Sequence, residues 1–135
     1  MDKKETHTHI PATSVILIDD DMFLLDMYAI KFKECGIAVD AITDPNLALG
    51  KLRAGATPDV VVVDIIMPGM GGFDFLETVR KEKLAPNAKY VVLSNQGQQD
   101  DLDRAKKYDV AGYIIKASAI PSEVCQKVLA IHTNA

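Results

Sequence analysis

Short apolar runs alternate along the chain with longer segments in which apolar residues recur at helical spacing. Consecutive apolar residues are typical of a strand buried on both faces of a sheet, whereas the longer period is typical of an amphipathic helix. The apolar runs predict strands over Val15–Ile18, Ile37–Ile42, Val60–Val63, Tyr90–Leu93 and Gly112–Ile115. The longer segments predict helices over Met22–Cys35, Asp44 to about Gly55, Phe73–Lys83, Gln99–Tyr108 and Ser118–His132.

Strands that alternate with helices form β-α-β crossovers, which give a parallel sheet covered by helices on both faces. The second predicted strand contains Asp40 and is expected at an edge of the sheet. The other four strands are uniformly apolar and are expected to be buried on both faces. We therefore predict an α/β fold, in which five helices cover a doubly wound, five-stranded parallel sheet in three layers.

The chain has 135 residues, a usual length for one domain. Its first residues are polar and lack periodicity. We therefore predict that residues 1–13 form a disordered lead-in and that residues 14–132 form the folded domain.

Composition argues against several classes of function. The formal net charge is −4 and no basic stripe is evident, which argues against direct contact with nucleic acid. No apolar run approaches the length of a membrane span, so no membrane partner is expected. Cys35 and Cys125 lack the spacing of a disulfide framework or a metal site. We interpret them as buried, reduced thiols of a cytoplasmic protein.

Polar side chains follow four of the five predicted strands at their carboxyl ends. They are Asp19, Asp20 and Asp21 after the first strand, Asp64 after the third, Ser94 after the fourth and Lys116 after the fifth. In a doubly wound sheet, ligands bind beyond the carboxyl ends of the strands. We therefore expect these side chains to converge on one site.

The expected cluster has the composition of a magnesium site. Carboxylates at close range require a cation or raise one another's pKa, and a set of oxygen ligands suits Mg²⁺. With the charge neutralised, one carboxylate can attack phosphorus, and Lys116 and Ser94 are placed to hold the phosphoryl oxygens. Asp21 has an alternative role as the N-cap of the following helix, and both roles stay open at this point.

Over about residues 14–131 the chain resembles the receiver domain of two-component response regulators. The matching pieces are Ile16-Leu17-Ile18-Asp19-Asp20, Val63-Asp64-Ile65-Ile66-Met67-Pro68-Gly69-Met70-Gly71-Gly72, Leu93-Ser94 and Tyr113-Ile114-Ile115-Lys116. The Asp-x-x-Met-Pro-x-Met-x-Gly run, with an acidic pair upstream and a Lys downstream, is highly specific. The resemblance implies a flavodoxin-like fold with strand order 2-1-3-4-5.

The resemblance also implies roles for the acidic residues. It implies Asp64 as the phospho-acceptor, and Asp19, Asp20, Asp64 and the backbone carbonyl of Ile66 as the ligands of Mg²⁺. The phosphodonor that it implies is a phosphohistidine on a histidine kinase or a histidine phosphotransfer protein. Such a domain is a regulatory phospho-acceptor that assists only its own phosphorylation and dephosphorylation, and is not otherwise an enzyme.

A switch follows from the same resemblance. Ser94 and Lys116 are implied to bind the phosphoryl group, and Tyr113 matches an aromatic residue whose rotation follows phosphorylation. A downstream protein, whose identity the sequence leaves open, is expected to distinguish the two states. The segments outside residues 14–132 are short, so we expect either a stand-alone receiver or a piece of a larger kinase or regulator.

Four positions depart from the family pattern. Ala117 stands where Pro usually follows the Lys, Gly71 replaces a usual Asp, and Asp109 replaces a Gly that usually ends the fourth helix. Asn95 stands where Ala or Gly is common, and it either narrows access to the phosphoryl site or adds a hydrogen bond. A pseudo-receiver, which binds partners without accepting phosphate, is therefore one alternative.

A haloacid-dehalogenase-type phosphatase is the alternative enzyme, because the triple aspartate at residues 19–21, Ser94 and Lys116 also fit its motifs. That fold needs a further acidic motif after the Lys, where only Glu123 follows, and it leaves Asp64 without a role. A flavodoxin-type FMN module is disfavoured, because three aspartates after the first strand would repel a phosphate.

The first predicted helix carries two apolar stripes. Its core stripe consists of Leu24, Leu25, Tyr28, Phe32 and Cys35. Phe23, Met27 and Ile30 form a second stripe at i, i+4 and i+7, one turn from Asp20. A helix that covers a sheet buries one face, so we predict that the second stripe docks the phosphodonor. Scattered surface apolar residues and a homodimer seam are the alternatives.

Overall fold

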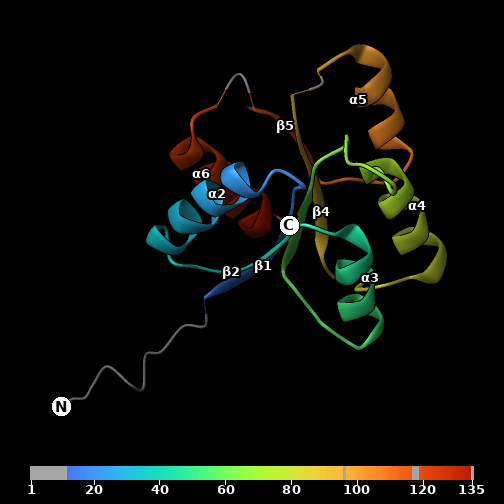
Figure 1. Cartoon of the computed structure of the whole chain (residues 1–135), viewed down its shortest axis with the longest axis horizontal. Helices are drawn as coiled ribbons and strands as arrows, with labels where there is room; N and C mark the ends of the chain where they lie inside the picture. Colours follow the sequence, from blue (N-terminus) through green and yellow to red (C-terminus); the bar gives the residue numbers. More distant parts are fainter. Residues whose placement is uncertain (1–11, 96, 117–118, 135) are drawn as a thin grey trace.

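The computed structural model describes residues 12–95, 97–116 and 119–134. Its centre is a parallel sheet with strand order β2-β1-β3-β4-β5 (Figure 1). The strands are β1 (Thr13–Ile18), β2 (Ile37–Ile42), β3 (Val60–Val63), β4 (Lys89–Ser94) and β5 (Gly112–Ile115). The predicted fold class and strand order are both confirmed.

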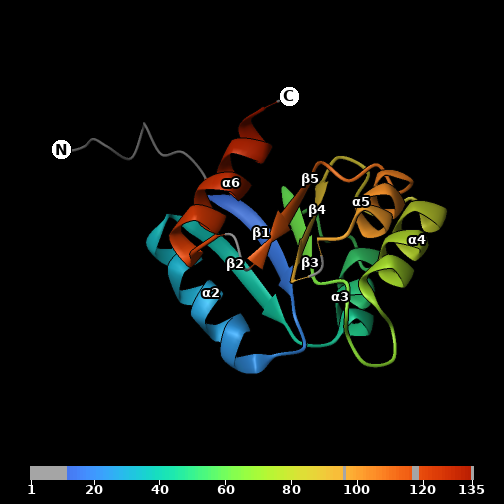
Figure 2. The same ribbon diagram turned by 90° about the horizontal axis from the view of Figure 1, so that it is seen from above.

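Helices cover both faces of this sheet, which gives the three predicted layers (Figure 2). They are α2 (Met22–Glu34), α3 (Pro45–Arg53), α4 (Gly72–Glu82), α5 (Gln99–Lys106) and α6 (Pro121–Thr133). Helices α2 and α6 pack on one face, and α3, α4 and α5 pack on the other.

Side chains along a strand point alternately to the two faces of the sheet, so each central strand contributes to the core on both faces. In β1, Val15 and Leu17 pack under α2 and α6, while Ile16 and Ile18 pack under the other three helices. All four valines of β3 are fully buried, because this strand lies in the middle of a sheet that is covered on both sides.

Local sequence features account for the ends of two helices. Asp44 accepts a hydrogen bond from the Asn46 N–H at 2.9 Å and caps α3. Gly36, which follows the end of α2, has a φ of +84°, a left-handed conformation that glycine adopts without strain.

Three details of the prediction were wrong. Strand β5 is less buried than predicted, because only Ile114 of its four residues is buried, although its place at the second edge of the sheet agrees with the predicted strand order. Helix α6 begins at Pro121, and Glu123 accepts a hydrogen bond from the Ile120 N–H at 3.0 Å. Cys35 is half-buried, although Cys125 is buried as predicted, and both are free thiols.

Some predictions fall on residues that are not described. Residues 1–11 of the predicted lead-in and positions 117 and 118 lie outside the described part of the chain. Strand β1 begins at Thr13, two residues before the predicted start.

Candidate functional site

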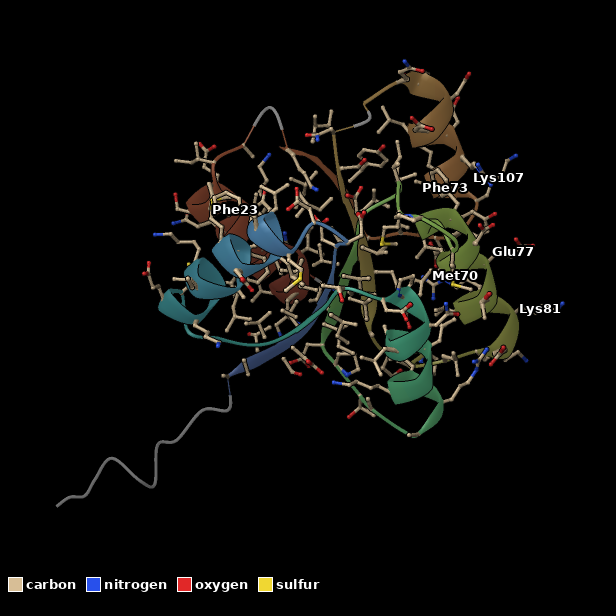
Figure 3. All side chains as sticks on the ribbon, viewed as in Figure 1. Phe23, Met70, Phe73, Glu77, Lys81 and Lys107 are labelled. Carbon is tan, nitrogen blue, oxygen red and sulfur yellow. The ribbon has the colours of Figure 1, made fainter. Side chains whose placement is uncertain are left out.

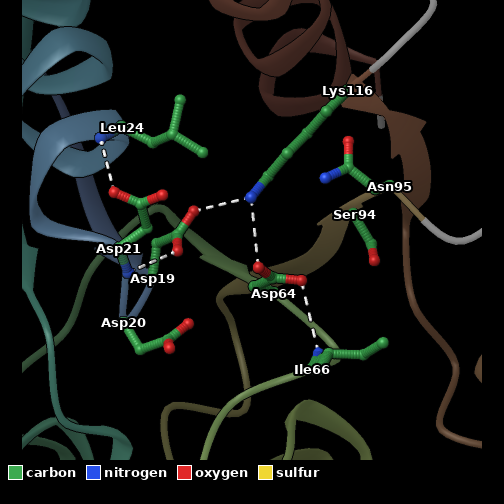
Figure 4. A pocket seen from close by; sticks show the side chains of 9 residues that line it. All are labelled: Asp19, Asp20, Asp21, Leu24, Asp64, Ile66, Ser94, Asn95 and Lys116. Atoms are coloured by element: carbon green, nitrogen blue, oxygen red, sulfur yellow. Dashed lines mark hydrogen bonds and ion pairs between the residues drawn. The ribbon is translucent and has the colours of Figure 1, made fainter.

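A cavity of about 270 Å³ opens at the carboxyl ends of β1, β3, β4 and β5 (Figure 4). We call it the acidic pocket. It is lined by Asp19, Asp20, Asp21, Leu24, Asp64, Ile66, Ser94, Asn95 and Lys116. The structure therefore brings together every strand-end residue that the sequence predicted for the site.

Strand register explains why the acidic residues meet. Ile18 of β1 pairs with Val63 of β3, so the residues that follow, Asp19 and Asp64, emerge side by side. Asp20 joins them from the loop after β1, and one oxygen from each of the three carboxylates lies within 4.8 Å of the others. Asp19 and Asp64 are only 2% and 9% exposed, so the protein must compensate their charges locally.

Lys116 supplies part of this compensation. Its Nζ donates to Oδ2 of Asp19 at 2.7 Å and to Oδ2 of Asp64 at 3.1 Å. Its side chain is 7% exposed. One ammonium beside three carboxylates leaves the cluster negatively charged, so the pocket still favours a cation.

The pKa values of Asp64 and Lys116 reflect both their burial and the charges around them. Burial raises the pKa of the Asp64 carboxyl above its usual value, although Lys116 acts in the opposite direction. Burial lowers the pKa of the Lys116 ammonium, but the hydrogen bond to Asp19 and the charges of Asp64 and Asp19 outweigh it and raise that pKa overall. Asp64 is thus a carboxylate that gains from further positive charge.

The acidic pocket fits Mg²⁺ by its donor set and spacing. Oxygen atoms bound to the same Mg²⁺ lie at most about 4.2 Å apart, twice the usual Mg–O distance. The carboxylate oxygens of Asp19, Asp20 and Asp64 need only a small contraction from 4.8 Å to reach that spacing. All three donors are oxygen atoms, the ligands that a hard divalent cation prefers.

Asp21 takes the alternative role that the sequence left open. Its Oδ1 accepts hydrogen bonds from the N–H groups of Phe23 at 3.0 Å and Leu24 at 3.2 Å, so it caps α2. Its own N–H donates to Oδ1 of Asp19 at 3.0 Å, which orients the Asp19 carboxylate.

Ser94 and Tyr113 occupy different positions relative to the pocket. Ser94 is the last residue of β4, is 1% exposed and lines the pocket. Tyr113 lies on β5, outside the lining, and packs half-buried against the face that α3, α4 and α5 cover. Burial, reinforced by the charges of Asp101 and Asp64, raises the pKa of Tyr113 to about 12.

Sequence reasoning gave Gly72 no role of its own, yet its lack of a side chain shapes the site. A Cβ at Gly72 would lie 2.2 Å from the backbone oxygen of Asp64. The Gly72 N–H also donates to the Ile65 carbonyl at 2.7 Å. The start of α4 can therefore approach the Asp64 loop only if this residue is glycine.

The second stripe of α2 is exposed as predicted. Phe23 is 77% exposed, Ile30 60% and Met27 37%. Phe23 lies on the opposite side of the molecule from Lys81 and Lys107 (Figure 3). Met22 is also exposed, by 66%, and was not predicted to be, because it is not at the i, i+4, i+7 spacing of the other three.

An apolar groove, which the sequence did not reveal, adjoins the acidic pocket. It is lined by Leu24, Met27, Tyr28, Asn95, Lys116, Ala119, Ile120 and Pro121. The groove joins the exposed stripe of α2 to the start of α6, where Ile120 is 61% exposed. These segments are about ninety residues apart in the chain, so no local pattern could place them together.

Two of the residues that depart from the family pattern, Asp109 and Gly71, lie at helix ends. Asp109 has a φ of 56°, the left-handed conformation expected where glycine is usual. Arg80 secures this turn, because its guanidinium donates to the carbonyl oxygens of Tyr108 at 2.7 Å and Asp109 at 2.9 Å. At Gly71 the N-cap of α4 has no side chain, and the Gly71 N–H donates to Asp74 at 3.4 Å.

No helix among the described residues has both the length and the apolar character that crossing a membrane requires.

Comparison with known proteins identifies relatives of this fold and site. The family described as "Response regulator receiver domain" matches residues 15–128. The chemotaxis protein CheY of Thermotoga maritima is 33% identical over 103 residues, which cover 76% of this chain and 83% of that protein. Both matches favour the receiver interpretation over the dehalogenase and flavodoxin alternatives.

Other relatives are longer or more distant. The alkaline phosphatase synthesis transcriptional regulatory protein SphR of Synechococcus elongatus is 29% identical over 80 residues, 53% of this chain but only 31% of that protein. The chain thus spans about a third of that regulator. The receiver domain of the putative response regulator NarL from Mycobacterium tuberculosis superposes with a TM-score of 0.79 at 22% identity, covering 93% of this chain and all of that one. This last likeness concerns the fold.

Proposed function

Because the chain belongs to the receiver domains of two-component response regulators, we propose that it accepts a phosphoryl group on Asp64 from a phosphohistidine. The donor class is a histidine kinase or a histidine phosphotransfer protein. The observation that carries the proposal is the Lys116 ammonium, which touches both Asp19 and Asp64 beside the carboxylate of Asp20. A receiver domain is a regulatory module, so the product is a change in partner binding.

The proposed transfer uses groups that are already in place. A carboxylate oxygen of Asp64 attacks phosphorus in line, the P–N bond to the donor imidazole breaks, and the imidazole leaves with its electron pair. Lys116 lies against Asp64 and can hold a phosphoryl oxygen once one is attached there. Asp19, Asp20, Asp64 and the Ile66 carbonyl would hold Mg²⁺, which would supply further positive charge to the phosphoryl group.

We propose that Ser94 and Tyr113 report the modification. Ser94 ends β4 at the pocket, so a hydrogen bond from its hydroxyl to the phosphoryl group draws the loop after β4 toward Asp64. Tyr113 is on the neighbouring strand and is half-buried, so movement of that loop changes the space open to its ring. The phosphorylated form then favours a state that the unmodified protein populates only weakly.

The donor is proposed to dock on the exposed stripe of α2. Phe23, Met27 and Ile30 are exposed, and Met27 also lines the apolar groove that adjoins the acidic pocket. A helix laid along this surface can present a phosphohistidine to the acidic pocket.

The phosphorylation proposal is tested with acetyl phosphate, a donor that needs no docking. Intact mass should increase by one phosphoryl group in wild type with Mg²⁺, but not with a chelator and not in Asp64→Asn. If wild type stays unmodified, the protein is a pseudo-receiver and the proposal fails.

Docking is tested with Met27→Glu and the matched control Leu47→Glu, which changes an exposed apolar residue on α3. Met27→Glu should slow transfer from a phosphorylated histidine protein about tenfold or more and leave acetyl phosphate labelling unchanged. Equal transfer rates in both variants would remove α2 as the docking surface.

The switch is tested with Ser94→Ala. Phosphorylation of wild type should shift the NMR signals of α5 and β5, and this shift should be lost in the variant even when Asp64 is fully modified. Retention of the shift would mean that coupling does not run through the Ser94 hydroxyl.

A further inference from the structure

The two cysteines of the chain meet between α2 and α6, although they are about ninety residues apart in the sequence. Cys35 follows the last residue of α2, and its N–H donates to the Lys31 and Phe32 carbonyls at 3.1 Å. Cys125 lies one turn into α6. The two helices pack on the same face of the sheet, and both cysteines belong to the hydrophobic core under them (Figure 2). Neither thiol has a part in the phosphorylation proposed above.

The two thiols interact with each other and with a neighbouring lysine. Burial, a hydrogen bond with Cys35 and the charge of Cys35 raise the pKa of the Cys125 thiol to about 12, while Lys31 acts in the opposite direction. The pKa of Lys31 is raised chiefly by Glu34, with smaller effects from Cys35 and Cys125. Both cysteines are free thiols, so the pair is in its reduced form.

The two thiols differ in their access to solvent. Cys35 is half-buried, whereas Cys125 is fully buried. Reactive cysteines are partly exposed and lie beside a positive charge, which describes Cys35, one turn after Lys31 on the same helix. A redox-sensitive cysteine also needs a second thiol within reach, which converts the oxidised sulfur to a disulfide. Cys125 is in that position.

We propose that Cys35 and Cys125 are a redox-sensitive pair that a peroxide converts to a disulfide between α2 and α6. The Cys35 sulfur attacks hydrogen peroxide, the O–O bond breaks, and Cys35 becomes a sulfenic acid as its proton and the departing hydroxide form water. The Cys125 sulfur then attacks the Cys35 sulfur, the S–O bond breaks, and the departing hydroxide takes the Cys125 proton as a second water. The two sulfur atoms lose two electrons in total, and one peroxide is reduced. These steps do not involve Asp64, so the pair acts independently of phosphorylation.

A disulfide at this position affects the apolar groove and the stability of the fold. Helix α2 contributes Leu24, Met27 and Tyr28 to the groove, and α6 contributes Pro121. The cross-link ties these two helices together, so oxidation limits how far the groove can open. It also closes a loop of about ninety residues, and such a cross-link stabilises a protein mainly by restricting its unfolded chain.

The experiment counts free thiols after oxidation. Reduced protein is treated with hydrogen peroxide at neutral pH, denatured in the presence of an alkylating reagent and analysed by intact mass. Treated wild type should remain monomeric and take up no alkyl group, and after dithiothreitol it should take up one on each cysteine. Digestion of the oxidised protein should yield a peptide pair joined through Cys35 and Cys125.

Cys125→Ala is the matched control, because it keeps Cys35 and removes the second thiol. Its Cys35 should be trapped by dimedone as a sulfenic acid after peroxide treatment. Oxidation should raise the Tm of wild type by about 7–14 °C. It should not raise the Tm of Cys125→Ala, which controls for oxidation of methionine. Cys125→Val, which fills more of the space of the thiol, takes its place if the Ala variant does not fold.

Two results would overturn the proposal. One is treated wild type in which Cys125 can still be alkylated while Cys35 is over-oxidised or joined to a second chain. The other is a disulfide that forms but leaves Tm at or below that of the reduced protein, because such a cross-link would distort the packing of α2 against α6.

Discussion

Replacing Lys116 by Met tests the electrostatic account of the acidic pocket. The substitution keeps an unbranched chain but removes the ammonium that lies 2.7 Å from Asp19 and 3.1 Å from Asp64. Those carboxylates, with side chains only 3% and 12% exposed, then face each other without their counter-charge. Removing one partner of such a buried ion pair destabilises a protein by about 3–5 kcal/mol.

This loss of free energy of unfolding can be converted to a decrease in melting temperature. At about 2.1 cal/mol/K per residue, 135 residues give an unfolding entropy of about 0.28 kcal/mol/K. Lys116→Met should therefore lower Tm by about 10–18 °C at pH 7 in the presence of a chelator. Lys107→Met is the control, because Lys107 is exposed. It should change the free energy of unfolding by no more than about 0.5 kcal/mol.

The pH dependence has a definite sign. The pKa of Lys116 is raised in the folded protein, so its stabilising effect is fully present below 10.5, the usual lysine value, and is lost as pH rises through the raised value. The difference between wild type and Lys116→Met should therefore shrink in strong alkali. It should also shrink in acid, where the carboxylates of the variant become protonated.

Thermal unfolding followed by circular dichroism, with chelator or with Mg²⁺, measures these differences. Mg²⁺ supplies positive charge to the same carboxylates, so it should stabilise the variant more than the wild type. A Tm for Lys116→Met within about 3 °C of wild type in chelator, at every pH, would refute the reasoning.

Three further substitutions test individual contacts, and a fourth, Gly50→Ala, is the control for Gly72→Ala. Asp21→Ala should lower the free energy of urea unfolding by about 1 kcal/mol through loss of the α2 cap, and a lost response to Mg²⁺ would contradict that role. Gly72→Ala places a Cβ 2.2 Å from the Asp64 carbonyl and should destabilise by about 1–3 kcal/mol and slow phosphorylation. Gly50→Ala, in open space on α3, should be neutral or stabilising in the same melting and labelling assays. Lys89→Met removes an ammonium that donates to carbonyls at the end of α6 and should destabilise by about 1–3 kcal/mol, with faster hydrogen exchange in its last turn.

The fold could be predicted because most of its strands are short apolar runs that are separated by clear helical periods. Val60–Val63 illustrates this, since four consecutive valines are typical of a strand that is covered on both sides, and all four are buried. The same reasoning overestimated the burial of β5, of whose four residues only Ile114 is buried. How far an edge strand is covered depends on the helices packed beside it, which is not a local property of the sequence.

The acidic pocket was predictable for a related reason. Residues that follow parallel strands must meet at one edge, so Asp19, Asp64 and Lys116 could be assigned to one site before their distances were known. The apolar groove could not be predicted, because it depends on how the start of α6 lies against α2. The double position of Asn95, in the walls of both cavities, is hidden from the sequence for the same reason.

Chemical trapping at Asp64 tests the central claim most directly. Protein labelled by acetyl phosphate with Mg²⁺ is reduced with borohydride, which converts an aspartyl phosphate to homoserine, and the digested peptides are sequenced by mass spectrometry. Homoserine should appear at position 64, in wild type and not in unlabelled protein. Homoserine at Asp19 or Asp20, or at no position in the chain, would contradict the assignment of Asp64 as the phospho-acceptor.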